Sequence, residues 1–134
     1  MIDIEVEVFD LVAKAVWAEF PNAYLTNEYI PTPSSLPCVC LSERDNSVYQ
    51  PTIDSSDDEK YANIMYELDV YSGKLNDRKR EAKRIASLAD DKLRKLGFVR
   101  MMLSPIDNPM DPSVYRIKGR YQATVSNKKV IYRR

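Results

Sequence analysis

The sequence predicts an α+β fold in which two α-helices pack on one face of a single, mainly antiparallel β-sheet, in the order α-β-β-β-α-β-β-β. Apolar residues recur at helical spacing near the N-terminus and again over residues 77–96. Apolar and polar residues alternate over residues 61–71 and 114–126, which indicates long strands with one buried face. The length of 134 residues suits one core, so we expect residues 1–134 to form a single domain.

The first helix is predicted over residues 3–19. The opening residues alternate apolar and acidic, a pattern that also suits a strand, but from Phe9 onward the spacing is helical. One side then carries the apolar residues Phe9, Val12, Ala13, Val16, Trp17 and Phe20. Acidic residues in the first turns are favoured by the helix dipole, and Pro21 with Asn22 ends the helix.

Two short strands are predicted next, over residues 23–30 and 36–42, joined by a proline-containing connector. Cys38 and Cys40 fall on the same face of the second strand. The chain has no histidine and no further cysteine, so we interpret the pair as small buried side chains rather than zinc ligands. Residues 43–60 are polar and are predicted to form a long connection.

Within that connection, residues 48–50 could extend the hairpin. The strand over residues 61–71 follows it and has an apolar face predicted to lie in the core, made of Ala62, Ile64, Tyr66, Leu68 and Val70. Its other face carries Asn63, Met65, Glu67 and Asp69. We expect this second face to look to solvent or to a partner.

The second helix is predicted over residues 77–96, with Asn76 as its N-cap and Gly97 as the residue that ends it. Its core side carries Ala82, Ile85, Leu88, Ala89, Leu93 and Leu96. Its outer side is basic and carries Arg78, Lys79, Arg80, Lys83 and Arg84.

The C-terminal part is predicted to return three strands to the same sheet. They cover residues 98–103, 114–126 and 129–132, with a proline-rich loop over 104–113 and a tight turn at Asn127. The core face of the long strand carries Tyr115, Ile117, Tyr121, Ala123 and Val125. The other face carries Arg116, Lys118, Arg120, Gln122 and Thr124.

Charge is divided between the two halves of the chain. Residues 1–69 contain fourteen acidic and three basic residues, whereas residues 70–134 contain six acidic and seventeen basic ones. The two halves could neutralise each other inside the fold, or the basic part could be a solvated face. A third reading is that acidic and basic surfaces meet head to tail between copies of the protein.

Several functional classes are excluded by composition. The chain has no histidine and three glycines, which removes the commonest general base and leaves no glycine-rich phosphate loop. The carboxylates Asp57, Asp58 and Glu59, and the pair Asp90 and Asp91, are predicted to be solvated rather than catalytic. We therefore expect no enzyme, no cofactor and no bound metal.

Localisation also follows from the pattern of residues. No run of about 18 apolar residues is present, so no membrane span is predicted. The N-terminal stretch is acidic, unlike a signal peptide, and we expect a soluble cytosolic product.

The basic strand face offers an alternative function. Arg116, Lys118 and Arg120 lie at a spacing of two and, with the basic helix, could bind nucleic-acid phosphates. The tyrosines of the long strands fall mostly on the core face, which argues against a base-stacking platform. The same cations could instead pair with Glu67 and Asp69, either across the sheet or across a subunit boundary.

Taken together, the order of elements and several local phrases resemble the small tail terminator proteins of long-tailed bacteriophages (siphophages) and their prophages, also called tail completion or head–tail joining proteins. The resemblance extends over most of the chain and rests on Phe20-Pro21-Asn22-Ala23-Tyr24, Tyr29-Ile30-Pro31-Thr32-Pro33-Ser34, Leu36-Pro37-Cys38-Val39, Met65-Tyr66-Glu67-Leu68-Asp69-Val70-Tyr71-Ser72, Lys95-Leu96-Gly97-Phe98, Val114-Tyr115-Arg116, Tyr121-Gln122-Ala123 and Ile131-Tyr132-Arg133-Arg134. None of these phrases is a catalytic motif.

The resemblance implies a structural role in virion assembly. Members of the family form rings, commonly hexamers, that cap the finished tail tube, stop its polymerisation and provide the interface for head–tail joining. The implied partners are further copies of the chain, the major tail tube protein and a head–tail connector protein, with DNA passing through the ring without tight binding. The implied location is the head–tail junction of the virion, and the host cytoplasm during assembly.

The candidate interface or DNA-lumen residues under this reading are charged. They are Glu67, Asp69, Arg116, Lys118, Arg120, Asp57, Asp58, Glu59, Arg133 and Arg134. A ring of identical subunits needs two different, complementary patches on each copy, and the divided charge of the chain fits that requirement.

Overall fold

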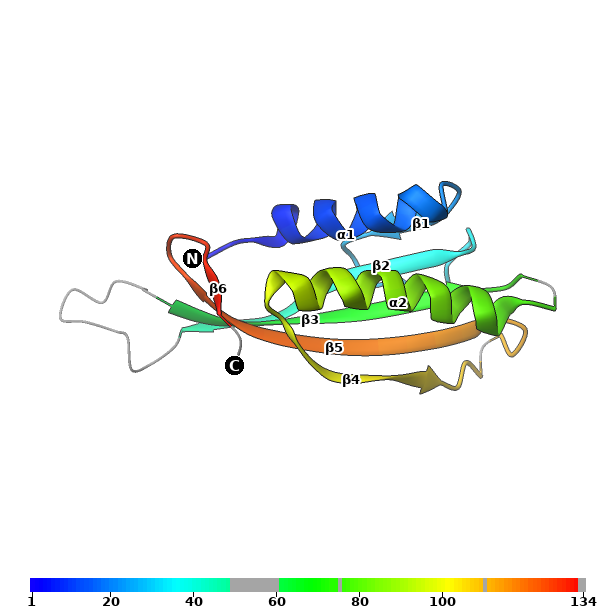
Figure 1. Ribbon diagram of the computed structural model, residues 1–134. Coiled ribbons are helices and arrows are strands. Elements are labelled where there is room, and N and C mark those ends of the chain that lie inside the picture. Colours follow the sequence, from blue (N-terminus) through cyan, green and yellow to red (C-terminus); the bar gives the residue numbers. More distant parts are fainter. Residues whose placement is uncertain (49–60, 75, 110, 133–134) are drawn as a thin grey trace.

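Among the residues that the structure describes, two helices cover one face of a six-stranded sheet and leave the other face without a helix (Figure 1). The computed structural model describes residues 1–48, 61–74, 76–109 and 111–132. The helices are α1 (Glu5–Glu19) and α2 (Arg78–Leu96). The predicted fold class and the predicted order of elements are confirmed.

The sheet is mixed and mostly antiparallel, with the strand order β1-β2-β3-β5-β4 and with β6 paired to β5. The strands are β1 (Tyr24–Thr26), β2 (Cys38–Val48), β3 (Tyr61–Ser72), β4 (Val99–Ile106), β5 (Tyr115–Ser126) and β6 (Ile131–Tyr132). β1 pairs with β2 in parallel, and the other pairs are antiparallel. The two longest strands, β3 and β5, therefore lie side by side at the centre and present their alternating residues in register.

The main core lies between the helices and the sheet. Tyr66, Tyr121 and Phe98 are among its largest fully buried side chains, and the rings of Tyr66 and Phe98 meet edge to face with centroids 5.5 Å apart. Trp17 was expected in this core but is 45% exposed. Its indole N–H donates a hydrogen bond of 2.9 Å to the carbonyl oxygen of Ala23, which holds the ring at the end of α1 rather than beneath it.

A smaller apolar cluster lies on the sheet face that no helix covers. It contains Cys38, Cys40, Tyr71 and Val114, with Ile30 packed against them. The two thiols are buried, and their sulfur atoms lie 3.9 Å apart. The interpretation of the cysteines as small buried side chains agrees with this position. Residue 30 belongs to the connector between β1 and β2, so this connector crosses onto the outer face of the sheet.

Strand boundaries differ from the prediction at β1, β2, β4 and β6, and β6 begins at Ile131 instead of residue 129. β1 ends at Thr26, because the Thr26 side chain accepts a hydrogen bond from the Glu28 amide and turns the chain. β2 continues to Val48 instead of ending near residue 42, since the long strand β3 offers backbone partners along its whole length. β4 likewise continues to Ile106 along β5.

The ends of α2 were predicted with mixed success. Gly97 does end the helix, with φ of 112°. The Gly97 amide bonds to the Arg94 carbonyl and the Phe98 amide to the Leu93 carbonyl, which satisfies the last turn. Asn76 is not the N-cap: Asp77 occupies that position, and no side chain caps the helix there.

Candidate interaction surfaces

Five charged residues form a ladder across the two central strands on the outer face of the sheet. We call Glu67 and Asp69 of β3, with Arg116, Lys118 and Arg120 of β5, the charged ladder. The pairing of the strands sets Glu67 opposite Arg120 and Asp69 opposite Lys118. Alternation along each strand then turns all five side chains away from the helices. The sequence placed these residues on one face correctly.

The acidic and basic residues of the charged ladder form ion pairs with one another within the chain. Arg116 Nη2 lies 2.8 Å from Asp69 Oδ1, and Lys118 Nζ lies 3.1 Å from Glu67 Oε2. Arg120 Nη2 lies 3.0 Å from Glu67 Oε1. Of the two pairings that the sequence left open, across the sheet or across a subunit boundary, the structure contains the first.

The ladder is also more covered than expected. Asp69 is fully buried, although the sequence suggested that this face looks to solvent or to a partner. The connector between β1 and β2 brings Tyr29 over the ladder, where its hydroxyl accepts a hydrogen bond of 3.3 Å from Arg116. The Tyr29 ring lies 5.3–5.7 Å from the cationic groups of Arg44, Arg116 and Lys118. The charged ladder is therefore a network of ion pairs within the chain, and Tyr29 packs over its cations.

Arg44 completes the network and was missed by the sequence analysis. It sits at the irregularity in β2 between Glu43 and Asp45, and its Nε lies 3.1 Å from Glu67 Oε2. Burial alone raises the pKa of Glu67, but the hydrogen bonds from Arg44, Lys118 and Arg120 outweigh burial and lower this pKa to about 2. Nothing in a single sequence marks the bulge that brings Arg44 to this position.

A second buried carboxylate joins α2 to the sheet. Asp90 was predicted to be solvated, but it is buried, and its Oδ1 accepts a hydrogen bond of 2.7 Å from the Tyr121 hydroxyl. Arg100 Nη1 of β4 lies 3.3 Å from Asp90 Oδ2. Burial, followed by this hydrogen bond, raises the pKa of Tyr121. Asp91 is exposed, as predicted, and lies 3.0 Å from Lys95.

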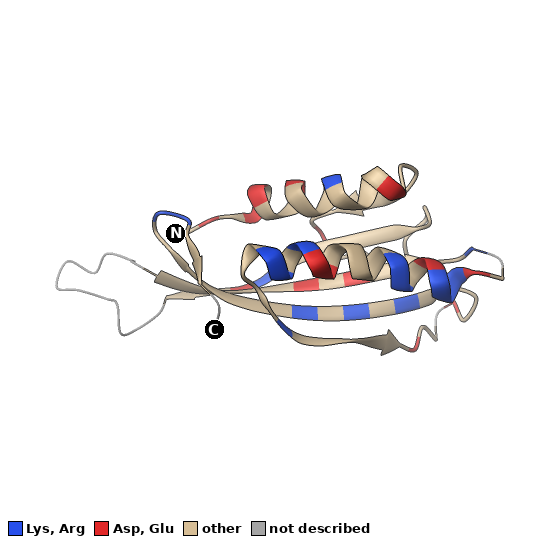
Figure 2. Cartoon of the chain, in the orientation of Figure 1, with Lys and Arg blue, Asp and Glu red and all other residues tan. Residues whose placement is uncertain are grey.

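The charged residues of α1 are mostly acidic, whereas those of α2 are mostly basic (Figure 2). On the acidic side, Glu43 lies opposite Tyr66 in the β2–β3 pairing and has one buried carboxylate oxygen without a partner. Burial raises the pKa of Glu43, and the nearby carboxylates of Glu5 and Asp3 raise it further. The folded protein therefore disfavours the ionised form of Glu43.

This arrangement predicts that Glu43→Gln stabilises the protein at neutral pH. Since the folded pKa of Glu43 lies above its unfolded value, ionised Glu43 is unfavourable in the fold at neutral pH, and that penalty disappears as the pH falls. We expect a gain of roughly 0.5–1 kcal/mol at neutral pH, because Glu43 is only partly buried and solvent screens its contacts. Urea unfolding at neutral pH and under acidic conditions measures it. Glu28→Gln, at an exposed site, is the control, and an equal gain there would contradict the prediction.

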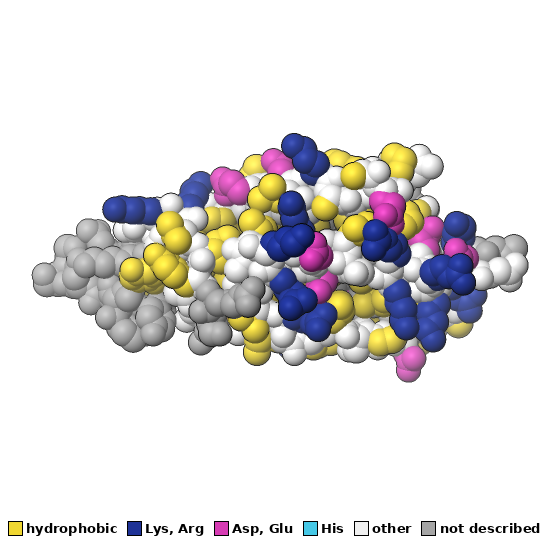
Figure 3. Space-filling view, in the orientation of Figure 1, with side chains coloured by type: hydrophobic (Ala, Val, Ile, Leu, Met, Phe, Trp, Pro, Cys, Tyr) yellow, Lys and Arg dark blue, Asp and Glu magenta, His cyan; other side chains and the backbone are white. Residues whose placement is uncertain are grey.

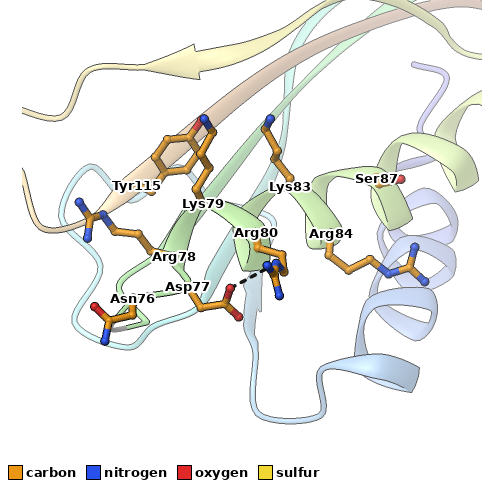
Figure 4. Close-up of a pocket in the computed structure, with 9 residues that line it drawn as sticks. All are labelled: Asn76, Asp77, Arg78, Lys79, Arg80, Lys83, Arg84, Ser87 and Tyr115. Atoms are coloured by element: carbon orange, nitrogen blue, oxygen red, sulfur yellow. Dashed lines mark ion pairs between the residues drawn. The ribbon is translucent and has the colours of Figure 1, made fainter.

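On the basic side, side chains around the N-terminal half of α2 surround an open hollow of about 850 Å³. Lys and Arg side chains gather over this part of the molecule (Figure 3). We call this surface the basic hollow; its lining residues are Asn76, Asp77, Arg78, Lys79, Arg80, Lys83, Arg84, Ser87 and Tyr115 (Figure 4). The sequence showed the basic side of this helix but did not select these residues as a site.

Asp57, Asp58, Glu59, Arg133 and Arg134 lie outside the described residues. Within the described ranges, no group of three or more Cys, Asp or Glu side chains is arranged to hold a metal ion. The same part of the chain contains no helix that is both long and apolar enough to cross a membrane.

The described part of the chain is a small α+β fold with charged surfaces on α1, on α2 and on the outer face of the sheet. Neither the models of known protein families nor the curated proteins compared with this chain give a match.

Proposed function

We propose that this protein is a structural virion component, a tail terminator that assembles into a ring on the tail tube, ends tail polymerisation and provides the surface for head–tail joining. The proposal starts from the resemblance of the sequence phrases to that family. The observed α+β fold is compatible with it, since the order of elements is the one on which the resemblance rests.

The observation that carries the proposal is the charge that remains divided at the surface after folding. The mostly acidic α1 and the mostly basic α2 lie side by side on one face of the sheet (Figure 2). A head-to-tail contact between identical copies requires two different, complementary surfaces on each copy, and such contacts close into rings when the rotation permits. Complementary charge would also select the correct register between neighbours.

Both edges of the sheet support the same proposal. In the described part of the chain, β1 and β4 each pair with a strand on one side only, which leaves backbone groups at either edge for a neighbour. Tyr24 on β1 and Met101 on β4 are large apolar side chains exposed at these edges. The proposed partners are further copies forming a hexamer, the tail tube protein and the head–tail connector, with DNA passing through the ring.

A phage that carries a stop codon in this gene tests the function. We expect tails of irregular length that fail to join heads, seen by electron microscopy, and expect the intact gene supplied in trans to restore infectious particles. Normal-length tails joined to heads in the absence of the protein would refute the proposal.

A further inference from the structure

Positive charge without a carboxylate partner is concentrated in the basic hollow. Of the seventeen described Lys and Arg side chains, eleven lie within ion-pairing distance of a described carboxylate. The six that make no such pair are Lys14, Arg78, Lys79, Lys83, Lys92 and Lys128. Three of them, Arg78, Lys79 and Lys83, line the basic hollow. The charges of these three side chains are therefore available to a partner.

The geometry of the hollow leaves these cations accessible. Lys79 and Lys83 are one helical turn apart and point to the same side of α2, where Tyr115 also lies (Figure 4). Asp77, the one carboxylate among the nine lining residues, is already contacted by Arg80 at 3.5 Å and by Lys74 at 3.8 Å. It does not neutralise the lysines.

The lining chemistry distinguishes between two kinds of acidic partner. Protein interfaces have a centre enriched in apolar and aromatic side chains and depleted of charge. Surfaces that contact nucleic acid are more polar and much more positively charged. The hollow is lined by five cations, polar side chains and one tyrosine, with no aliphatic side chain among them. This composition favours a nucleic-acid backbone over a protein surface.

We propose that the basic hollow binds the sugar–phosphate backbone of nucleic acid without regard to sequence. Lysine ammonium groups bind phosphates as point charges, and Arg78 adds a guanidinium at the start of the helix. Phosphate contacts from these side chains would supply the affinity, and such contacts carry no sequence information. This surface lies apart from the charged ladder, whose cations already contact carboxylates. The inference goes beyond the proposed function and stands without it. It assigns the N-terminal half of α2 to nucleic acid and leaves the C-terminal half, with Lys92, Arg94 and Lys95, for a head-to-tail contact.

Fluorescence anisotropy with a labelled DNA duplex of mixed sequence, about 30 base pairs long, tests the proposal. We expect binding that weakens with salt, and a loss of at least about tenfold in the variant Lys79→Glu with Lys83→Glu. Because each lost phosphate contact removes about 0.9 from the slope of log K against log salt, the double variant should reduce that slope by about two. A second mixed sequence should bind with the same affinity.

The matched control changes the same number of charges elsewhere. Lys14 and Lys128 are exposed and also make no ion pair with a described carboxylate, so Lys14→Glu with Lys128→Glu alters the net charge equally. We expect less than a threefold effect from this pair, and circular dichroism should show that both variants are folded. Absence of binding at about 50 mM salt, or equal losses in both variants, would overturn the proposal.

Sedimentation of the same variants separates the two partners. If Lys79→Glu with Lys83→Glu abolished self-association but left DNA binding intact, the hollow would belong to a protein interface and the proposal would fail. DNA binding by the free protein does not depend on tail assembly, so failure of the phage experiment and failure of this one are distinguishable.

Discussion

Asp69→Asn is expected to lower the free energy of unfolding by about 3–5 kcal/mol. Asp69 is fully buried, and its Oδ1 lies 2.8 Å from Arg116 Nη2 and 3.8 Å from Lys118 Nζ. Asparagine keeps the volume but removes the charge, which leaves the largely buried Arg116 guanidinium without its counterion. Since domains of this kind have about 5–15 kcal/mol of stability in total, the loss would be a large share. Urea unfolding, compared at equal m-values, measures it.

Two further variants make the Asp69 result interpretable. Asp91→Asn removes an exposed carboxylate 3.0 Å from Lys95 and should cost less than about 1 kcal/mol. Asp69→Asn combined with Arg116→Gln removes both charges, and we expect it to recover at least about 1 kcal/mol of the loss. A cost below about 1 kcal/mol for Asp69→Asn alone would mean that the ladder contributes little to stability.

The elements with long periodic patterns were predictable from the sequence. β3 and β5 each carry an apolar face opposite a helix layer, and their alternation is visible in the sequence. The helical spacing of apolar residues, together with Gly97, likewise predicted where α2 ends. The extent of β2 and β4 was not predictable, because polar residues continue each strand wherever β3 or β5 offers backbone partners. Tertiary pairing overrides local propensity there.

The sequence predicted which residues of the charged ladder share a face of the sheet, but not how deeply they are buried. Alternation alone put the five ladder residues together. The cover over Arg116 and Lys118 is Tyr29, which lies in a connector whose path over the sheet no local pattern encodes. The burial of Asp90 has the same kind of cause, since the Tyr121 hydroxyl that it accepts from is thirty-one positions away in the chain.

Ion pairs within the chain neutralise part of the charge that is divided between the two halves of the sequence. Glu19 pairs with Arg84, and Glu7 pairs with Lys129, so acids of the first half meet bases of the second half. Glu67 and Asp69 do the same in the ladder. Neutralisation within the chain, one of the three readings of the sequence, therefore accounts for these pairs. The surface charge left over is smaller than the sequence totals suggest, and on the basic side it is concentrated in the basic hollow.

Glu67→Gln is expected to destabilise the protein at neutral pH and to lose that effect in acid. The folded pKa of Glu67 is lowered to about 2 from an ordinary value of 4.5. A lowered folded pKa means that ionised Glu67 stabilises the fold at pH values above its unfolded pKa, and that this stability is lost as the pH falls toward the folded pKa. We expect a difference of about 2–3 kcal/mol between the two proteins at neutral pH, allowing for solvent screening.

The way in which the stability loss of Glu67→Gln varies with pH tests the cause of that loss as well as its size. If the three cations around Glu67 lower its pKa, the difference between wild type and Glu67→Gln should shrink between about pH 4.5 and pH 2 and stay constant above that window. Urea unfolding at a series of pH values measures it, with Glu28→Gln as the control. A difference that did not vary with pH would show that the introduced amide side chain disturbs packing instead. Arg44→Gln removes one of the three cations and should raise the folded pKa of Glu67. The pH range over which the stability difference changes should therefore become narrower.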